Sequence, residues 1–277
     1  MKTAYCLGPN GSYSAIIAKK MYPKLQMKLC NSFFEVVKAM SGDNNSIALL
    51  PVENSITSDV HENIDYLFSQ NNVQIMAEGY LVIDLNLIGL HGSKIEDITS
   101  VYSHPKALLQ TSLFINEHNL ATIETNSTSE GKNTILDENN IHKACIGSSE
   151  LTDESKLVIL AKNIGNYQNN MTRFLAITHL SEVDKLHDEP IIKGSYVFNV
   201  KHEPGTLARV LTQLAATKVN LTKIESRPIP GTEWEYSFLV DLEMNSNLVS
   251  EVEKILEKNT AHIKRRGLYV KGNVYIN

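Results

Sequence analysis

The sequence predicts an α/β fold in two parts, a larger N-terminal α/β unit and a small C-terminal βαββαβ unit of the ferredoxin-like type. In the larger part, short apolar runs alternate with amphipathic stretches of helical period. A charged segment at 179–193 then interrupts the apolar pattern, and we interpret it as a linker. The apolar fraction of 42% in 277 residues is typical of a globular protein with room for two cores.

The N-terminal part repeats a strand followed by a helix. The first pair is predicted at Thr3–Leu7 and Ser12–Met21, and the second at Ile47–Pro51 and Asp59–Ser69. Later strands are predicted at Tyr80–Leu90, Ile98–Ser103, Lys143–Gly147 and Thr172–Ile177, with helical patterns after Ser103 and at Ser129–Asn139. This alternation predicts a parallel sheet, with one α/β lobe inserted in another.

The C-terminal part has the order of a ferredoxin-like unit. Its predicted elements are a strand at Ser195–Val200, a helix at Gly205–Ala216, strands at Val219–Arg227 and Glu233–Asp241, a helix at Leu248–Lys258 and a strand at His262–Val270.

Charge and motif content exclude several classes of protein. The formal net charge of −5 provides no basic field for nucleic acid. The histidines and cysteines form no zinc pattern, and a Gly-x-Ser-x-Gly elbow and dinucleotide or Walker loops are missing, so no metal, flavin or nicotinamide is expected. Cys6, Cys30 and Cys145 are predicted to be reduced thiols. With no signal-like or membrane-length apolar segment, the expected location is the cytoplasm.

Two polar clusters follow the first predicted strands. Gly8–Ser14 turns a strand into a helix and could bind an anion on free backbone N–H groups, although a plain turn capped by Ser12 is an equal alternative. Glu53, Asn54 and Ser55 follow the next strand, at the sheet edge where α/β proteins bind ligands. A helix cap at Asn54 or Ser55 is the competing interpretation.

Three later clusters have the same design. His104 follows a strand, with Pro105 fitting the first helical turn, and could donate to a ligand, although a lone histidine is more often structural. Asn126–Ser129 adds hydroxyls at another helix start. In Asn169–Phe174 a hydroxyl adjoins Arg173, which can hold a carboxylate or merely lie on a strand edge.

Taken in this order, these motifs resemble the signature of the prephenate dehydratase family. His202–Leu207 and Asn220–Pro228 resemble the ACT domain of that family, so the resemblance spans Thr3 to Tyr269. It implies a bilobed catalytic domain like type II periplasmic binding proteins at 1–178, with a second lobe inserted at roughly 80–160. It further implies a linker at 179–193, an ACT domain at 194–277 and a homotetramer formed as a dimer of dimers.

The resemblance also implies an activity, the conversion of prephenate to phenylpyruvate with loss of CO2 and water in L-phenylalanine biosynthesis, without a cofactor. The implied catalytic residues are Thr172, Arg173 and Phe174, with Thr172 acting on the departing hydroxyl and Phe174 packing behind it. The implied substrate-binding residues are Gly11, Ser12, Glu53, Asn54, Ser55, Ser103, His104, Ser127, Thr128 and Asn170.

L-Phenylalanine is the implied effector, bound between paired ACT domains. The residues implied to bind it are His202, Pro204, Gly205, Thr206, Leu207, Glu225, Ser226, Arg227 and Pro228. The chain departs from the usual family pattern at Ser58, Lys106, Ser129, Gly131 and Thr206. Of these, Lys106 places a cation near the cleft, and Thr206 adds a hydroxyl near the effector site.

Other functions remain open at this stage. Arogenate dehydratase runs the same elimination on a substrate with an amino group in place of the ketone, and the motifs scarcely separate the two. A non-enzymatic amino-acid-binding regulator is a second alternative, against which the retained Thr172-Arg173-Phe174 argues. Caps and turns alone would not explain the joint order of the motifs.

Overall fold

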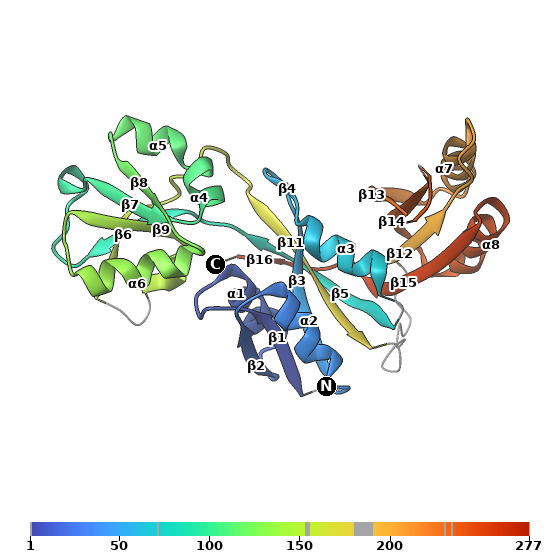
Figure 1. The fold of residues 1–277 in the computed structure, drawn as a ribbon, viewed down its shortest axis with the longest axis horizontal. Helices are drawn as coiled ribbons and strands as arrows, with labels where there is room; N and C mark the ends of the chain where they lie inside the picture. Colours follow the sequence, from blue (N-terminus) through green and yellow to red (C-terminus); the bar gives the residue numbers. More distant parts are fainter. Residues whose placement is uncertain are drawn as a thin grey trace. The chain divides into compact units, whose positions relative to one another are not determined.

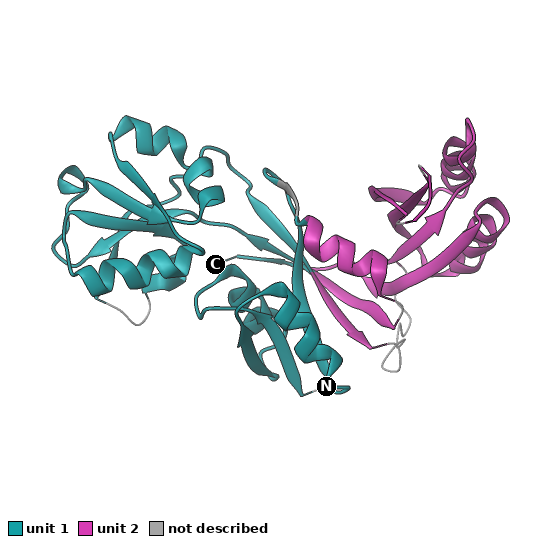
Figure 2. Ribbon diagram, viewed as in Figure 1, with its two compact units in different colours: residues 1–60, 79–174, 274–277 teal, residues 61–78, 175–273 magenta. Residues whose placement is uncertain are grey.

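The computed structural model describes residues 2–70, 72–152, 156–179, 191–229, 231–233 and 235–276, without the side chains of Ser58 and Asp59. These residues form three β-sheets with flanking helices (Figure 1). The chain divides into two compact units, one of residues 1–60, 79–174 and 274–277 and the other of residues 61–78 and 175–273 (Figure 2). Most of the predicted linker, 180–190, lies outside the described residues.

The first sheet has the strand order β16-β5-β11-β3-β1-β2, with β4 paired to β3. Its strands are β1 (Thr3–Leu7), β2 (Gln26–Cys30), β3 (Ser46–Asn54), β4 (Ser58–Asp59), β5 (Val73–Val82), β11 (Met171–His179) and β16 (Val274–Tyr275). β1 is parallel to β2 and β3, as predicted for alternating strands and helices. The division into units runs through β5 and β11.

Two helices cover the strands at the N-terminal end of the chain, α1 (Tyr13–Met21) and α2 (Phe33–Ser41). Ser12 begins α1, because its hydroxyl accepts a hydrogen bond from Ala15 N at 3.2 Å. Lys19 and Lys20 lie in the last turn of α1, where the helix dipole favours positive charge. We call residues 2–60, 79–82 and 171–174 the first lobe.

The second sheet has the order β10-β6-β9-β7-β8 and belongs wholly to the first unit. Its strands are β6 (Asn86–Leu90), β7 (Ser100–Ser103), β8 (Ala121–Glu124), β9 (Lys143–Gly147) and β10 (Leu157–Ala161). β7 is parallel to β8 and β9, but β6 is antiparallel to β9 and β10. The prediction of a parallel sheet is therefore wrong for β6, and β10 was not predicted; the chain enters and leaves this sheet through these two strands without a crossover helix.

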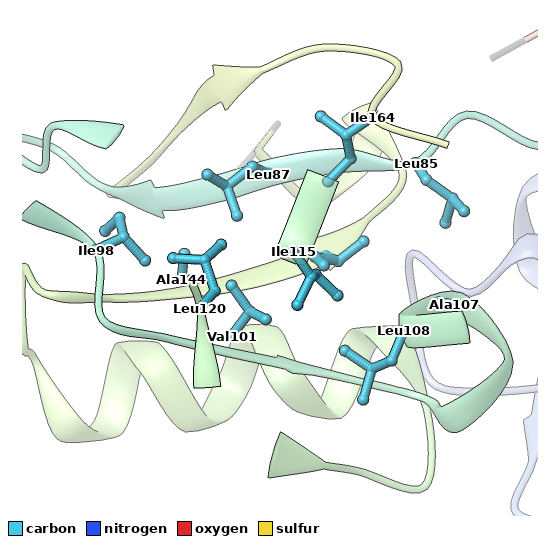
Figure 3. Packing of buried hydrophobic residues seen from close by; sticks show 11 residues of the cluster. Leu85, Leu87, Ile98, Val101, Ala107, Leu108, Ile115, Leu120, Ala144 and Ile164 are labelled. Carbon is cyan, nitrogen blue, oxygen red and sulfur yellow. The ribbon is translucent and has the colours of Figure 1, made fainter. Parts of the chain in front are cut away.

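Residues 85–162 form what we call the second lobe. Its helices are α4 (Pro105–Gln110), α5 (Ser112–Glu117) and α6 (Thr128–Glu138), with 3₁₀ turns η1 (Ile95–Asp97) and η2 (Ser149–Thr152). The single strand predicted at Tyr80–Leu90 is wrong, since 83–85 separate β5 from β6. Figure 3 shows the core, in which Leu87, Val101 and Ala144 pack with Leu108 and Ile115. Each buried Leu or Ile contributes about 1.5–3 kcal/mol.

The third sheet, in the second unit, confirms the predicted βαββαβ order. Its strands are β12 (Ile191–Asn199), β13 (Asn220–Pro228), β14 (Tyr236–Asn245) and β15 (His262–Val270), in the antiparallel order β13-β14-β12-β15. The helices are α7 (Thr206–Ala216) and α8 (Val249–Asn259), with the 3₁₀ turn η4 (Ser246–Leu248). Phe198, Val210 and Leu256 lie in the core between them.

Helix α3 (His61–Ser69) and residues 73–78 belong to the same unit as this third sheet. Arg266, 2% exposed, donates to Phe68 O at 2.8 Å and to Gln70 O, and so satisfies carbonyls at the end of α3. Burial lowers the pKa of Arg266 to about 10.

Lys193 and Glu78 form a buried ion pair at 3.1 Å. The domain boundaries at 178 and 194 stay predictions.

Over the described ranges, the helices are too short or too polar to cross a membrane.

Candidate active site

A cavity of about 330 Å³ in the first unit is lined by residues of both lobes. Its polar lining in the first lobe is Ser12, Tyr13, Ser14, Asn54, Thr57 and Thr172, and in the second lobe His104, Lys106, Gln110, Asn126, Ser127 and Thr128. Ser12 lies in the loop after β1, Asn54 is the last residue of β3, and His104 follows β7 directly. These residues therefore lie at the carboxyl ends of strands, where α/β proteins bind ligands. Phe33, Ile83, Leu85 and Phe174 add apolar surface.

The charge around this cavity suits an anion. Among the described residues that line it there is no Asp or Glu, and Lys106 is the one Lys or Arg. Helices α1 and α6 both begin at the cavity, since Ser12, Tyr13, Ser127 and Thr128 line it. The free N–H groups and dipole of a helix start favour negative charge. A ligand with carboxylates is therefore expected.

Asn54 determines the direction of the hydrogen bond that the Thr172 hydroxyl makes with it. The side-chain oxygen of Asn54 accepts from the backbone N–H groups of Ile56 at 3.0 Å and Thr57 at 2.9 Å, and these groups can only donate. The amide nitrogen must then face the other way, where it donates to Thr172 Oγ1 at 3.0 Å. Since Thr172 accepts this bond, its own hydroxyl proton is left for an acceptor in the cavity.

A chain of side-chain amide hydrogen bonds leads from Asn54 into the second lobe. Asn54 Nδ2 also donates to Asn170 Oδ1 at 2.8 Å, and Asn170 Nδ2 donates to Gln110 Oε1 at 3.0 Å. The Oε1 atom of Gln110 is therefore occupied, and no described residue supplies an acceptor for its Nε2 group. The side chain of Gln110 lines the cavity, so this Nε2 group is left to donate to a ligand. The relay from Thr172 to Gln110 joins both lobes.

His104 caps α4 and lines the cavity. Its Nδ1 accepts from Lys106 N at 3.2 Å, so the neutral ring carries its proton on Nε2. Burial, followed by the charge of Lys106, lowers the pKa of His104 below its usual value, while Glu124 opposes this shift. His104 is then a neutral N–H donor at neutral pH.

The start of α6 is a capping box. Ser127 Oγ accepts from Glu130 N at 3.0 Å, and Glu130 Oε2 accepts from Asn126 N at 2.7 Å. This leaves the backbone N–H groups of Thr128 and Ser129 without an intrahelical acceptor.

The loop before α1 requires glycine at Gly11, whose φ is +82° and where a Cβ would lie 2.9 Å from Leu151 Cδ2. Ser12 uses its hydroxyl within the loop, since Oγ donates to Leu7 O at 2.8 Å and accepts from Ala15 N at 3.2 Å. Gly11 and Ser12 therefore shape the helix start and leave its backbone to meet a ligand.

Other predicted site residues lie beside the cavity lining. Arg173, 4% exposed, has its Nη1 3.6 Å from Glu53 Oε2, so its charge is balanced. Ser55 Oγ donates to Asn169 O at 3.1 Å and accepts from Met171 N at 2.9 Å. Ser103, fully buried, donates to Ile146 O at 2.6 Å. These groups, with Asn170, hold the strand ends that carry the lining residues.

Sequence reasoning gave no role of their own to Gln110, Tyr13, Thr57, Asn126 or Phe33, although Tyr13 and Asn126 belong to predicted polar clusters and all five line the cavity. Tyr13 donates from its hydroxyl to Asp84 O at 2.6 Å, in the crossover between the lobes. The available signal for Gln110 was a polar residue on the apolar face of a short helix, where it is 8% exposed.

The departures from the family pattern occupy different places. Lys106 lines the cavity, whereas Ser58 lies in β4, which pairs with β3. Ser129 is 2% exposed, and its hydroxyl has no partner among the described residues. At Gly131 a Cβ would lie 2.9 Å from Tyr102 O, so the lack of a side chain lets α6 approach β7 closely.

Metal and thiol chemistry find little support in the described ranges. No group of three or more His, Cys, Asp or Glu that could hold a metal occurs there. The three cysteines are free, as predicted, and burial raises the pKa of Cys6 and of Cys145 to about 12, which makes both poor nucleophiles.

A second cavity, of about 440 Å³, lies in the second unit at the loop before α7. Of the predicted effector residues it is lined by His202, Pro204, Gly205, Thr206 and Leu207. Glu225, Ser226, Arg227 and Pro228 lie on β13 instead. Arg227 pairs there with Asp65 and Glu225, each at 2.5 Å.

The hydroxyl of Thr206 is already used by the loop. It donates to Lys201 O at 2.8 Å and to Glu203 O at 2.5 Å. It therefore stabilises the turn before α7 more than it adds polarity to the cavity.

Comparisons with known proteins agree over both parts of the chain. Residues 4–182 match the family model described as prephenate dehydratase, and residues 196–257 match the ACT domain model. A prephenate dehydratase of Methanocaldococcus jannaschii is 34% identical over 94% of this chain and 95% of its own. An arogenate dehydratase/prephenate dehydratase of Arabidopsis thaliana is 32% identical over 95% of this chain and 71% of its own. A crystal structure of prephenate dehydratase from Arthrobacter aurescens in complex with L-Phe superposes with a TM-score of 0.87 at 23% identity, covering 97% and 90% of the two chains.

Proposed function

The chain belongs to the prephenate dehydratase family, and on that premise we propose that it converts prephenate to phenylpyruvate, CO2 and water. The observation that carries this function is the hydroxyl of Thr172, which accepts a hydrogen bond from Asn54 at 3.0 Å and lines a cavity with no Asp or Glu among its described lining residues. Prephenate has two carboxylates and a leaving hydroxyl, and this cavity offers hydrogen-bond donors to each. The fold is that of the family, a bilobed catalytic part followed by an ACT domain.

In the proposed reaction, the ring carboxylate leaves as CO2 and its bonding electrons enter the ring. The ring C–O bond breaks at the same time, and the departing hydroxide becomes water. Thr172 donates a hydrogen bond to this oxygen and relays a proton to it from solvent, since a threonine hydroxyl is too weak an acid to act unaided. Aromatisation provides the driving force, so the protein supplies positioning and electrostatic stabilisation.

The carboxylates of the substrate lie at the starts of α1 and α6 and near Lys106. Gly11, Ser12, Ser127 and Thr128 supply or shape the backbone donors there. His104 adds its Nε2–H, and Gln110 its Nε2 amide group. Phe174, 1% exposed, packs behind Thr172.

The residues beside the lining act by support. Arg173 pairs with Glu53 at 3.6 Å, and this pair holds the start of β11. Ser55, Ser103 and Asn170, which were predicted to bind substrate, are proposed instead to hold the strand ends.

L-Phenylalanine is the proposed effector. The second cavity combines apolar Val200, Leu207 and Phe238 with the turn at Gly205, which suits an apolar side chain beside backbone polar groups. The L-Phe complex of the Arthrobacter aurescens protein supports this choice. Glu225, Ser226, Arg227 and Pro228 take part from the ACT domain of a second subunit, in a cytoplasmic homotetramer built as a dimer of dimers. Effector binding then lowers substrate affinity through linkage between quaternary states.

Prephenate is favoured over arogenate by the charge of the cavity. Arogenate carries an ammonium group where prephenate has a ketone, and a buried ammonium needs an anionic partner. The described lining contains no Asp or Glu to provide one. A purely regulatory, non-enzymatic role is disfavoured, because binding alone does not require a hydroxyl oriented as Thr172 is.

The test is to mix the purified protein with prephenate or with arogenate and record phenylpyruvate or phenylalanine, with and without added L-phenylalanine. Phenylpyruvate formed from prephenate, and less of it with L-phenylalanine, is the expected result. Faster turnover of arogenate would contradict the substrate assignment, and no turnover of either would contradict the enzymatic role.

A further inference from the structure

Asn166 makes four hydrogen bonds to the corner between α4 and α5. Its backbone N–H donates to Gln110 O at 2.6 Å. Its side-chain Nδ2 donates to Leu109 O at 3.1 Å and to Ser112 Oγ at 2.9 Å, while Oδ1 accepts from Leu113 N at 3.1 Å. Leu109 O can only accept and Leu113 N can only donate, so the orientation of the amide is fixed.

These bonds satisfy groups that the break between the two helices leaves open. The last carbonyls of α4 and the first N–H groups of α5 have no intrahelical partners. Thr111, at the break, turns its hydroxyl back to Ala107 O at 2.8 Å. Asn166 supplies partners from a distant segment, the return crossover between β10 and β11. Figure 3 shows the apolar anchor of this segment, Ile164, in the same core as Leu108 and Ile115.

Gln110 is consequently held at both ends by one loop. The backbone N–H of Asn166, which substitution by alanine keeps, donates to the Gln110 carbonyl, and the Asn166 side chain holds the helix corner around Gln110 through Leu109 O and Leu113 N. Asn170, four residues later, donates to Gln110 Oε1 at 3.0 Å. Asn170 is in turn bonded to Asn54, which donates to Thr172. Five residues lie between Asn166 and Thr172, so the loop that fixes the helix corner also leads into the strand that carries the hydroxyl.

We propose that Asn166 is a positioning residue for the elimination, which acts through Gln110 and the relay from Gln110 to Thr172. It does not line the cavity itself. This inference rests on the proposed dehydratase function. The amide is required because a carboxylate at this position keeps the bond from Leu113 N but cannot donate to Leu109 O, and it brings two negative oxygens against a carbonyl.

The test compares Asn166→Ala with Gln168→Ala, a control in the same exposed loop whose side chain makes no hydrogen bond among the described residues. We expect Asn166→Ala to lower kcat for prephenate about 10- to 100-fold, as displacements near 1 Å do, with a smaller change in KM. Asn166→Asp should lower kcat at least as much as Asn166→Ala, because it sets a negative oxygen against Leu109 O. Gln168→Ala should keep full kcat.

A double-mutant cycle with Gln110→Ala separates positioning from simple destabilisation. If Asn166 acts through Gln110, Asn166→Ala should lower kcat less than threefold further in the Gln110→Ala background. Thermal unfolding of each variant shows that assays run well below its Tm. Full kcat in Asn166→Ala, or losses that multiply in the double variant, would overturn the inference while leaving the dehydratase function standing. An unmutated protein inactive on both substrates would overturn both.

Discussion

Asn54→Asp exchanges a single NH2 group for an oxygen, and its effect follows from the polarity of the relay. The carboxylate can still accept from Ile56 N and Thr57 N, at 3.0 and 2.9 Å in the present structure. The other oxygen replaces a donor that faces Asn170 Oδ1, Met171 O and Thr172 Oγ1 at 2.8, 3.1 and 3.0 Å. The hydroxyl of Thr172 can reverse and donate by rotation about a single bond, whereas Met171 O cannot donate and Asn170 could do so only if its amide and that of Gln110 both turned over.

The reversal removes the proton of Thr172 from the cavity. Loss of one preorganised donor to a developing charge costs about 100- to 1000-fold in kcat, or about 2.7–4 kcal/mol. A negative charge is also added to a cavity whose described lining has no Asp or Glu, and this charge opposes binding of a dianion. We therefore expect kcat to fall about 1000-fold and KM to rise.

Asn54→Ala is the informative comparison. Alanine removes the positioning bond but does not capture the proton of Thr172, so this variant should retain more activity than Asn54→Asp, although aspartate is closer to asparagine in shape. The assay is steady-state phenylpyruvate formation by both variants, with circular dichroism and Tm as checks of folding. Higher kcat in Asn54→Asp than in Asn54→Ala would refute the polarity derived for the relay.

Three further predictions concern pH and stability. The pKa of His104 is lowered in the folded protein, so the unfolded chain binds more protons than the folded one as pH falls below about 6.5. Relative to His104→Gln, the free energy of unfolding of the unmutated protein should therefore drop between pH 7.5 and 5.5 and level off below the folded pKa. The same pH dependence of unfolding by urea in both proteins would count against this. Gly131→Ala should destabilise by about 1–3 kcal/mol despite its better helix propensity, since Cβ meets Tyr102 O at 2.9 Å, and a raised Tm would be the contrary result. Arg266→Met leaves Phe68 O without its donor and leaves Gln70 O only the 3.4 Å bond from Lys264 Nζ, so it should lower Tm by several degrees at about 1–3 kcal/mol for the unpaired carbonyl, whereas the exposed change Lys201→Met should not.

Local patterns predicted the start of α1 and much of the C-terminal sheet, whereas α2 was not predicted. Ser12 and Ser127 were predictable as caps because a cap depends on residues within one turn. β2 was not predicted, since as an edge strand it is largely exposed and lacks apolar alternation. The split between β5 and β6 was missed because the apolar run continues through the crossover at 83–85.

The relay of the candidate site could not be predicted from spacing. Asn54, Gln110 and Asn170 are far apart in the chain and meet only through the packing of two lobes. The same limit applies to Arg173, for which sequence alone does not reveal that Glu53 lies within 3.6 Å. Motifs identified which residues belong to the site, whereas tertiary contacts decide which of them face the cavity.

Thr172→Val and Thr172→Ser, assayed for kcat on prephenate, test most directly whether this hydroxyl assists departure of the substrate oxygen. Serine keeps the donor and should stay within about tenfold of the unmutated protein, while isosteric valine should lose about 1000-fold in kcat with little change in KM. Turnover by folded Thr172→Val at nearly the original rate would contradict the central claim.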